Sequence, residues 1–107
     1  MNKLHVGLVQ LAAGEDRRRN LGTAEALIGR LPEVDLIALP EVFAQRGNDA
    51  DYRAAAEPIP GPTTEWLSRL AAARGAWVLG GSVIERDGDV IYNTSVLADR
   101  AGAIRTT

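Results

Sequence analysis

An apolar run that leads into a proline and a glutamate places the strongest constraint on how this 107-residue chain can fold. Residues 34–39 read VDLIAL and are followed at once by Pro40 and Glu41. A near-continuous apolar run of this length is typical of a strand that is covered on both faces. We therefore predict a strand over Val34–Leu39, with a carboxylate just beyond its carboxyl end.

The residues before this strand predict that it belongs to a βαβ unit. Residues Leu4–Leu11, which read LHVGLVQL, favour a first strand. Apolar residues then recur at helical spacing over Arg17–Leu31, with Asp16 as the expected N-cap and Pro32 as the residue that stops the helix. Strands joined by a crossover helix run parallel, so both strands should end at the same edge of one sheet.

The second half of the chain predicts a helix and antiparallel strands. The segment AQRGNDADYRAAAEPIPGP reads as a long, stiff, irregular connector. A helix is expected over Thr63–Arg74, with Pro62 in its first turn and Gly75 as its C-terminal cap. The runs AWVLGGSVIE and VIYNTSVLA flank RDGD, which predicts a hairpin through Asp87-Gly88, and a last strand begins in AIRTT.

These elements predict an α/β fold, with a mixed sheet and helices on one face. We assign residues 1–107 to a single partial domain, because nothing in the length indicates two domains. Val78, Val83 and Val96 predict that the other face of the sheet is apolar as well. That face would need a further layer to pack against, and these residues offer nothing obvious to cover it.

The composition excludes several kinds of site. Lys and Arg number 12 and Asp and Glu number 14, so the net charge of −2 gives no electrostatic reason to expect nucleic acid. With one histidine and no cysteine there is no Cys/His pair, and we expect neither a metal nor a cofactor. No apolar stretch approaches the ~20 residues that cross a bilayer, and the N-terminus reads as a strand rather than a signal peptide, so we expect a cytoplasmic protein.

Glu41 is the leading candidate for a catalytic group. Sites in open α/β sheets gather beyond the carboxyl ends of the strands, where Glu41 lies. Pro40 fixes its own φ and restricts Leu39, so the backbone should hold the carboxylate firmly, as a general base requires. The alternative is that Glu41 caps a helix or pairs with Arg46, and the local sequence alone favours this structural role.

Three other features have ordinary structural explanations. His5 lies early in the first strand, away from Glu41, and is expected to be a packed or surface residue. The glycines of Gly80-Gly81-Ser82 more often mark a bulge or a close backbone approach than an oxyanion loop. Asn93 is able to hydrogen-bond into a site, although holding a neighbouring loop is the more common role.

The order and spacing of several segments resemble the carbon–nitrogen hydrolase (nitrilase) superfamily. The segments are HVGLVQL, Asn20, DLIALPEVF, PIPGPTTEWLSRLAAARGAWVLGGSVIE and YNTSVLADRAG. They extend through essentially the whole chain and are similar to the amidase branch that includes the omega-amidases. The resemblance implies a four-layer α-β-β-α sandwich of two six-stranded sheets, of which residues 1–107 form the N-terminal part.

The resemblance also implies a Glu-Lys-Cys triad that converts an amide to a carboxylic acid and ammonia. The Glu of the family's PE motif falls on Glu41. The family's Lys and Cys follow the position of Thr107, and the single lysine of this chain, Lys3, lies at the wrong edge of the sheet. We therefore expect the 107 residues alone to be inactive, and the complete protein to be a homo-oligomer that takes a small-molecule amide.

The substrate and the exact reaction stay open at this point. Phe43 and the loop Gln45–Pro60 are predicted to touch the substrate, and a small dicarboxylic acid monoamide is the favoured class. Acyl transfer, or delivery of ammonia to a partner domain, is an alternative within the family. A truncated, non-catalytic relative that serves as a binding or assembly module is the alternative outside it.

Overall fold

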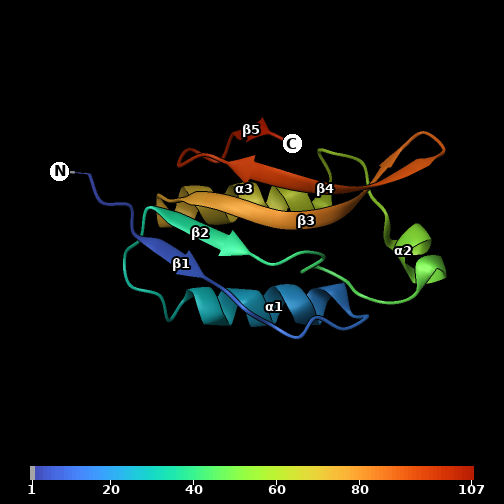
Figure 1. Cartoon of the computed structure of the whole chain (residues 1–107), viewed down its shortest axis with the longest axis horizontal. Helices are drawn as coiled ribbons and strands as arrows, with labels where there is room; N and C mark the ends of the chain where they lie inside the picture. The colour runs from blue at the N-terminus through green and yellow to red at the C-terminus, as the bar shows by residue number, and fades with distance from the viewer. Residues whose placement is uncertain (1) are drawn as a thin grey trace.

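The computed structural model describes residues 2–107 and contains one five-stranded mixed sheet. The strands lie side by side in chain order, and β1, β2 and β3 run parallel while β4 and β5 are antiparallel to their neighbours (Figure 1). Their bounds are Val6–Leu8 for β1, Leu36–Leu39 for β2, Trp77–Asp87 for β3, Val90–Ala98 for β4 and Ile104–Thr106 for β5.

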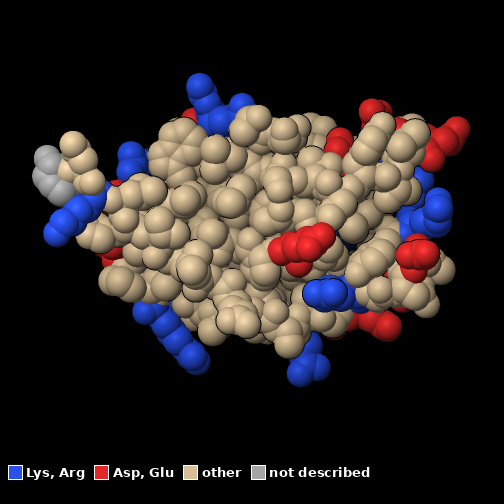
Figure 2. Space-filling view, viewed as in Figure 1, with Lys and Arg blue, Asp and Glu red and all other residues tan. Residues whose placement is uncertain are grey.

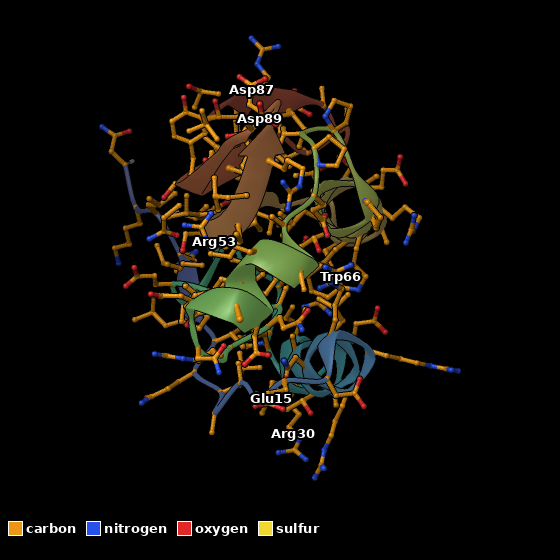
Figure 3. All side chains as sticks on the ribbon, turned by 90° about the vertical axis from the view of Figure 1, so that its right-hand side faces the viewer. Glu15, Arg30, Arg53, Trp66, Asp87 and Asp89 are labelled. Atoms are coloured by element: carbon orange, nitrogen blue, oxygen red, sulfur yellow. The ribbon has the colours of Figure 1, made fainter. Side chains whose placement is uncertain are left out.

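Two of the three helices cover one face of this sheet. Helices α1 (Arg17–Ile28) and α3 (Pro62–Arg74) lie behind the strands in Figure 1, and the view in Figure 3 shows both on the same side of the sheet. The short helix α2 (Asp49–Ala55) lies beyond the end of β2. The prediction of an α/β fold with a mixed sheet and helices on one face is confirmed.

The ends of α1 and α3 follow from local hydrogen bonding. The Asp16 side chain accepts from the backbone N–H of Arg19 and caps α1, as predicted. However, α1 ends at Ile28 and not at Leu31, because Gly29 caps it and the chain continues in single turns. Helix α3 ends as predicted at Gly75, whose φ of 60° favours a residue without a β-carbon.

Two predicted elements differ from the structure. The segment predicted as an irregular connector contains α2, which Asn48 and Asp51 begin through a reciprocal capping box. The first strand is only three residues long, over Val6–Leu8, instead of Leu4–Leu11. The hairpin through Asp87-Gly88 is confirmed, with Gly88 at a φ of 61°.

The hydrophobic core lies between the sheet and the two long helices. Fully buried side chains from the sheet include Ile37, Val78 and Val96, which meet Ala24 of α1 and Leu67 of α3 in one cluster. Burying a side chain of this size stabilises a fold by about 1.5–3 kcal/mol. Helix α1 and helix α3 are also joined directly, since the Trp66 indole N–H donates to the Glu25 carboxylate.

The assignment of three valines to the uncovered face is wrong. Val78, Val83 and Val96 are buried in the core on the side of the helices. Side chains of a strand alternate between faces, and a bulge between Gly80 and Val83 changes this alternation along β3. The sequence pattern alone therefore did not show which valines share a face with which neighbours.

The face opposite the helices is nevertheless apolar, through other residues. Val6 and Leu8 of β1 are 43% and 77% exposed there. Their register partners Leu36 and Ala38, and then Leu79 and Leu97, continue the same face across the sheet. We call this surface the open face and define it by Val6, Leu8, Leu36, Ala38, Leu79 and Leu97. Figure 2, drawn from the same side as Figure 1, shows mostly uncharged atoms over the strands.

Within residues 2–107, none of the helices combines the length and the apolar character that crossing a bilayer requires.

Candidate active site

Glu41 lies directly beyond the carboxyl end of β2 and its side chain is exposed. The chain forms a turn at this point and not a helix, so Glu41 is not a helix cap. Arg46, the other partner considered from the sequence, forms no ion pair with Glu41 within 4.0 Å; the ion pairs among residues 2–107 join other groups. The carboxylate is therefore available for other contacts.

The backbone around Glu41 is held by β3. Val42 has a φ of 49°, a left-handed conformation that β-branched residues rarely adopt. Its backbone N–H donates to the buried Ser82 hydroxyl over 2.9 Å, which satisfies the donor in this unusual conformation. Backbone outliers of this kind cost about 1–3 kcal/mol and persist where the surroundings fix them. The local geometry thus turns the chain sharply after Glu41.

Gly81 allows β3 to come close to the same turn. A β-carbon at Gly81 would lie 2.6 Å from the carbonyl oxygen of Pro40, so no larger residue fits without a backbone shift. The strand bulges at this position, between Gly80 and Val83. The prediction that the paired glycines mark a bulge and a close backbone approach is confirmed.

Asn93 of β4 contacts the Glu41 carboxylate. Its amide Nδ2 donates to Glu41 Oε1 over 2.8 Å, although 52 residues separate the two. Asn93 and Ser95 point to the face opposite the buried Val96 side, since their side chains alternate with it along the strand. Glu41 and Asn93 therefore meet on the same side of the sheet as the open face.

A second set of hydrogen bonds ties the chain after Glu41 to the start of α1. The buried Asn20 side chain donates through Nδ2 to the carbonyls of Ala44 and Gly14, each over 2.9 Å, and accepts from the Gly14 N–H over 3.0 Å. Asn20 is one of the residues that carry the family resemblance, but the sequence predicted no role for its side chain. A buried amide with all of its groups paired is a rigid connection between two loops.

Phe43 does not reach the surface. Its side chain is fully buried and its ring lies 5.9 Å from the ring of Trp66. A direct role in substrate binding stays a prediction that no contact tests, and the position of Phe43 is that of a core residue. Phe43 anchors the chain in the core two residues after Glu41, and this helps to fix the backbone that carries the carboxylate.

A cleft lies beside Asn93, between α2 and the β3–β4 hairpin. Tyr52 and Arg53 of α2 line one side of it, and Tyr92 and Asn93 of β4 line the other. Arg53 is exposed, and the ion pairs among residues 2–107 do not include its guanidinium. Figure 3 shows Arg53 extending from α2 toward the sheet. The cleft is thus lined by Asn93, which contacts Glu41, and by the cationic Arg53, with the acidic Asp49 also in its wall.

An ion pair between the buried Glu57 and the partly buried Arg17 fixes the segment that follows α2. The Arg17 guanidinium lies 3.1 Å from the Glu57 carboxylate, and the same carboxylate accepts from the N–H and the hydroxyl of Thr63. Arg17 also donates to the Ala55 carbonyl at the end of α2. These contacts connect α1 to the start of α3 and support the wall of the cleft.

The arrangement is suited to proton transfer more than to metal binding. Among residues 2–107, no three His, Asp or Glu side chains come together in a group that could hold a metal ion. His5 lies far from Glu41, near Asp35, as expected of a surface residue. A firmly placed carboxylate that accepts one hydrogen bond and faces open space is a suitable general base.

Comparison with known proteins decides the family. The sequence model of the carbon-nitrogen hydrolase family matches residues 5–107. This chain belongs to the carbon–nitrogen hydrolase family. Omega-amidase NIT2 of Danio rerio is 32% identical over 109 residues, an alignment that covers 100% of this chain and 39% of that protein. The chloroplastic omega-amidase of Arabidopsis thaliana is 29% identical and is covered over 30% of its length.

Solved structures of carbon–nitrogen hydrolases agree with this assignment. XC1258 of Xanthomonas campestris, a CN-hydrolase superfamily protein, is 32% identical and superposes with a TM-score of 0.87 over 98% of this chain and 40% of its own. Nit3 of Saccharomyces cerevisiae, from branch 10 of the nitrilase superfamily, is 30% identical with a TM-score of 0.85, over 94% of this chain and 41% of its own. The chain thus spans about 40% of the length of these relatives.

Proposed function

We propose that residues 1–107 are the general-base segment of an amidase that hydrolyses non-peptide amides. The observation that carries the proposal is the placement of Glu41, an exposed carboxylate at the carboxyl end of β2 that accepts a hydrogen bond from Asn93 on the same side of the sheet as the open face. The family's first catalytic residue, the Glu of its PE motif, corresponds to Glu41. Relatives named omega-amidases support the reaction class.

The chemistry implied by the family divides the reaction into two steps. Glu41 takes the proton of a cysteine thiol, the sulfur bonds to the amide carbon, and the C–N bond breaks as the proton passes to the departing ammonia. Water then attacks the thioester and Glu41 takes its proton; the C–S bond breaks as that proton passes to the sulfur, which releases the carboxylic acid and restores the thiol. A lysine stabilises the oxyanion in both steps. Residues 1–107 contain no cysteine, so the nucleophile has to come from elsewhere in the full-length protein.

The open face is suited to packing against the part of the full-length protein that would carry the cysteine and the lysine. Val6 and Leu8 are apolar and exposed, as expected of a sheet that packs against a further layer. In the four-layer sandwich of the family, the second sheet would cover this face and bring the thiol and the lysine toward Glu41. The full-length protein is the complete product of the gene that encodes residues 1–107. We expect the full-length protein to be a homo-oligomer.

The cleft beside Asn93 supports a small anionic amide as the substrate. Arg53 offers a guanidinium without a carboxylate partner among residues 2–107, and guanidinium groups bind carboxylates in a bidentate manner. A substrate with an amide at one end and a carboxylate at the other would place the amide near Glu41 and the carboxylate near Arg53. A dicarboxylic acid monoamide has this form.

The test of the proposal is Glu41→Gln in the full-length protein. Loss of the general base should lower kcat for amide hydrolysis by about 10²- to 10⁴-fold, because Gln keeps the shape but cannot accept the proton. The release of ammonia from a dicarboxylic acid monoamide measures this. Activity within tenfold of the parent would contradict the assignment. The 107 residues alone should release no ammonia, and turnover by them would exclude the need for an external cysteine.

The alternative function is a non-catalytic assembly module, which the apolar open face also favours. The reading frame beyond the codon for Thr107 distinguishes the two. A frame that continues to a lysine and then a cysteine supports the amidase, and an immediate stop codon supports the module.

A further inference from the structure

The hydrogen bond between Asn93 and Glu41 has a consequence for catalysis that depends on the proposed function. We propose that Asn93 is the positioning residue of the general base: it holds Glu41 Oε1 through its amide and leaves the second carboxylate oxygen for proton transfer. Among residues 2–107, the hydrogen bond from Asn93 is the one that the Glu41 side chain accepts. The second oxygen is thus open to a thiol or a water molecule.

The two ends of Glu41 are fixed from different strands. Pro40, the left-handed Val42 and the Ser82 hydroxyl fix its backbone against β3. The side chain still has three rotatable bonds, and a backbone anchor does not restrict them. Asn93 supplies the missing restraint from β4, where its backbone is paired in register with Ile84 of β3. A general base has to be held in reach of the proton that it accepts, so this restraint acts on the chemical step.

An asparagine suits this task better than a charged donor. Its amide donates a hydrogen bond but brings no positive charge, so it orients the carboxylate without forming an ion pair with it. Arg17 shows the contrast within the same chain, since it forms an ion pair with the buried Glu57 in a structural connection. Asn93 also lines the cleft that contains Arg53, and therefore links the general base to the wall of the proposed substrate site.

The neighbouring residue provides a matched control. Thr94 donates through its hydroxyl to the Glu85 carboxylate over 2.7 Å, which is the same kind of bond one position along β4. That bond does not involve Glu41. A Thr94→Val variant removes this hydrogen bond from β4 and keeps the side-chain volume. It therefore measures what the loss of a side-chain hydrogen bond does to the strand when Glu41 is not involved.

The experiment compares variants of the full-length protein in ammonia release. Asn93→Ala should lower kcat by about 10- to 100-fold, the loss expected for a hydrogen bond to a charged group, with KM and the unfolding midpoint almost unchanged. Asn93→Asp, which keeps the shape but sets a second carboxylate against Glu41, should lower kcat further. Thr94→Val should keep kcat within about twofold, because its bond acts on Glu85.

A double variant separates positioning from support of the fold. In a Glu41→Gln background, Asn93→Ala should cause no further loss of residual activity, because Asn93 acts through Glu41. An equal loss in both backgrounds would overturn the proposal and indicate a structural role. If Asn93→Ala lowers the unfolding midpoint, the isosteric Asn93→Asp variant decides: unchanged kcat in that variant also overturns the proposal.

The results distinguish this inference from the function on which it depends. An inactive Glu41→Gln variant together with a fully active Asn93→Ala variant would contradict the positioning role and leave Glu41 as the base. A fully active Glu41→Gln variant would contradict the proposed function itself.

Discussion

A β-carbon at Gly81 would lie 2.6 Å from the carbonyl oxygen of Pro40, closer than folded proteins tolerate. The turn that carries Glu41 and the bulge in β3 therefore pack backbone against backbone. The Ser95 hydroxyl donates to the Gly81 carbonyl and fixes the bulge from β4 as well. The position of the candidate base therefore depends on this contact as well as on the proline before it.

Replacing Gly81 should be costly for this reason. Gly81→Ala forces the turn and β3 apart and should lower the free energy of unfolding by about 1–3 kcal/mol, measured by urea denaturation. Gly22→Ala is the control, because nothing lies within 4 Å of its β-carbon position in α1. That variant should raise stability by about 0.5–1 kcal/mol through helix propensity. Equal effects of the two substitutions would contradict the close approach.

Loss of the Glu57 carboxylate should leave the buried side of Arg17 without its counter-charge. Glu57→Ala is expected to lower the free energy of unfolding by about 2 kcal/mol, because the partly buried Arg17 guanidinium and the buried N–H and hydroxyl of Thr63 lose their acceptor. The pair of Arg105 and Asp99, 3.8 Å apart on the surface, serves for comparison. Arg105→Ala should change stability by less than about 1 kcal/mol. A Glu57 variant as stable as the Arg105 variant would show that the pair is not structural.

The 107 residues alone should self-associate through the open face. Leu8→Lys places a charge where an apolar side chain is 77% exposed, and should shift the chain toward the monomer in sedimentation equilibrium. Val90→Lys is the matched control, because Val90 is 49% exposed at the start of β4 in the hairpin and lies outside the open face as defined above. A parent chain that is monomeric at high concentration would refute the prediction.

Arg53 should select for a charged substrate. In the full-length protein, Arg53→Ala is expected to raise KM for a dicarboxylic acid monoamide by about tenfold, because a hydrogen-bonded ion pair with the substrate is lost. KM for an uncharged amide should change little. Steady-state ammonia release with both substrates measures the difference, and an equal rise in KM for the two would place the substrate carboxylate elsewhere.

The sequence predicts those parts of the fold that local chemistry decides. The N-cap at Asp16, the left-handed Gly75 and the hairpin at Gly88 each depend on a few neighbouring residues, and each is confirmed. The helix α2 was missed although Asn48 and Asp51 carry the signal of a capping box, because the prolines after it made the whole segment read as a connector.

Features that depend on distant contacts could not be read in this way. The bulge at Gly81 decides which valines of β3 face the helices, and its effect on the register is visible only once β4 is in place. The bond from Asn93 to Glu41 joins residues 52 positions apart, and the burial of Phe43 depends on Trp66 of α3. The location of Glu41 could be predicted because it follows a strand, but the residues that contact it could not.

The strands of this sheet are neighbours in space in the same order as they occur along the chain. During synthesis on a ribosome, each strand that emerges from the exit tunnel can therefore join one that has already formed, without waiting for later residues. Asn93 would reach Glu41 once β4 has emerged from the tunnel. Under the proposed function, the general base and its positioning residue would then meet before the cysteine nucleophile has emerged.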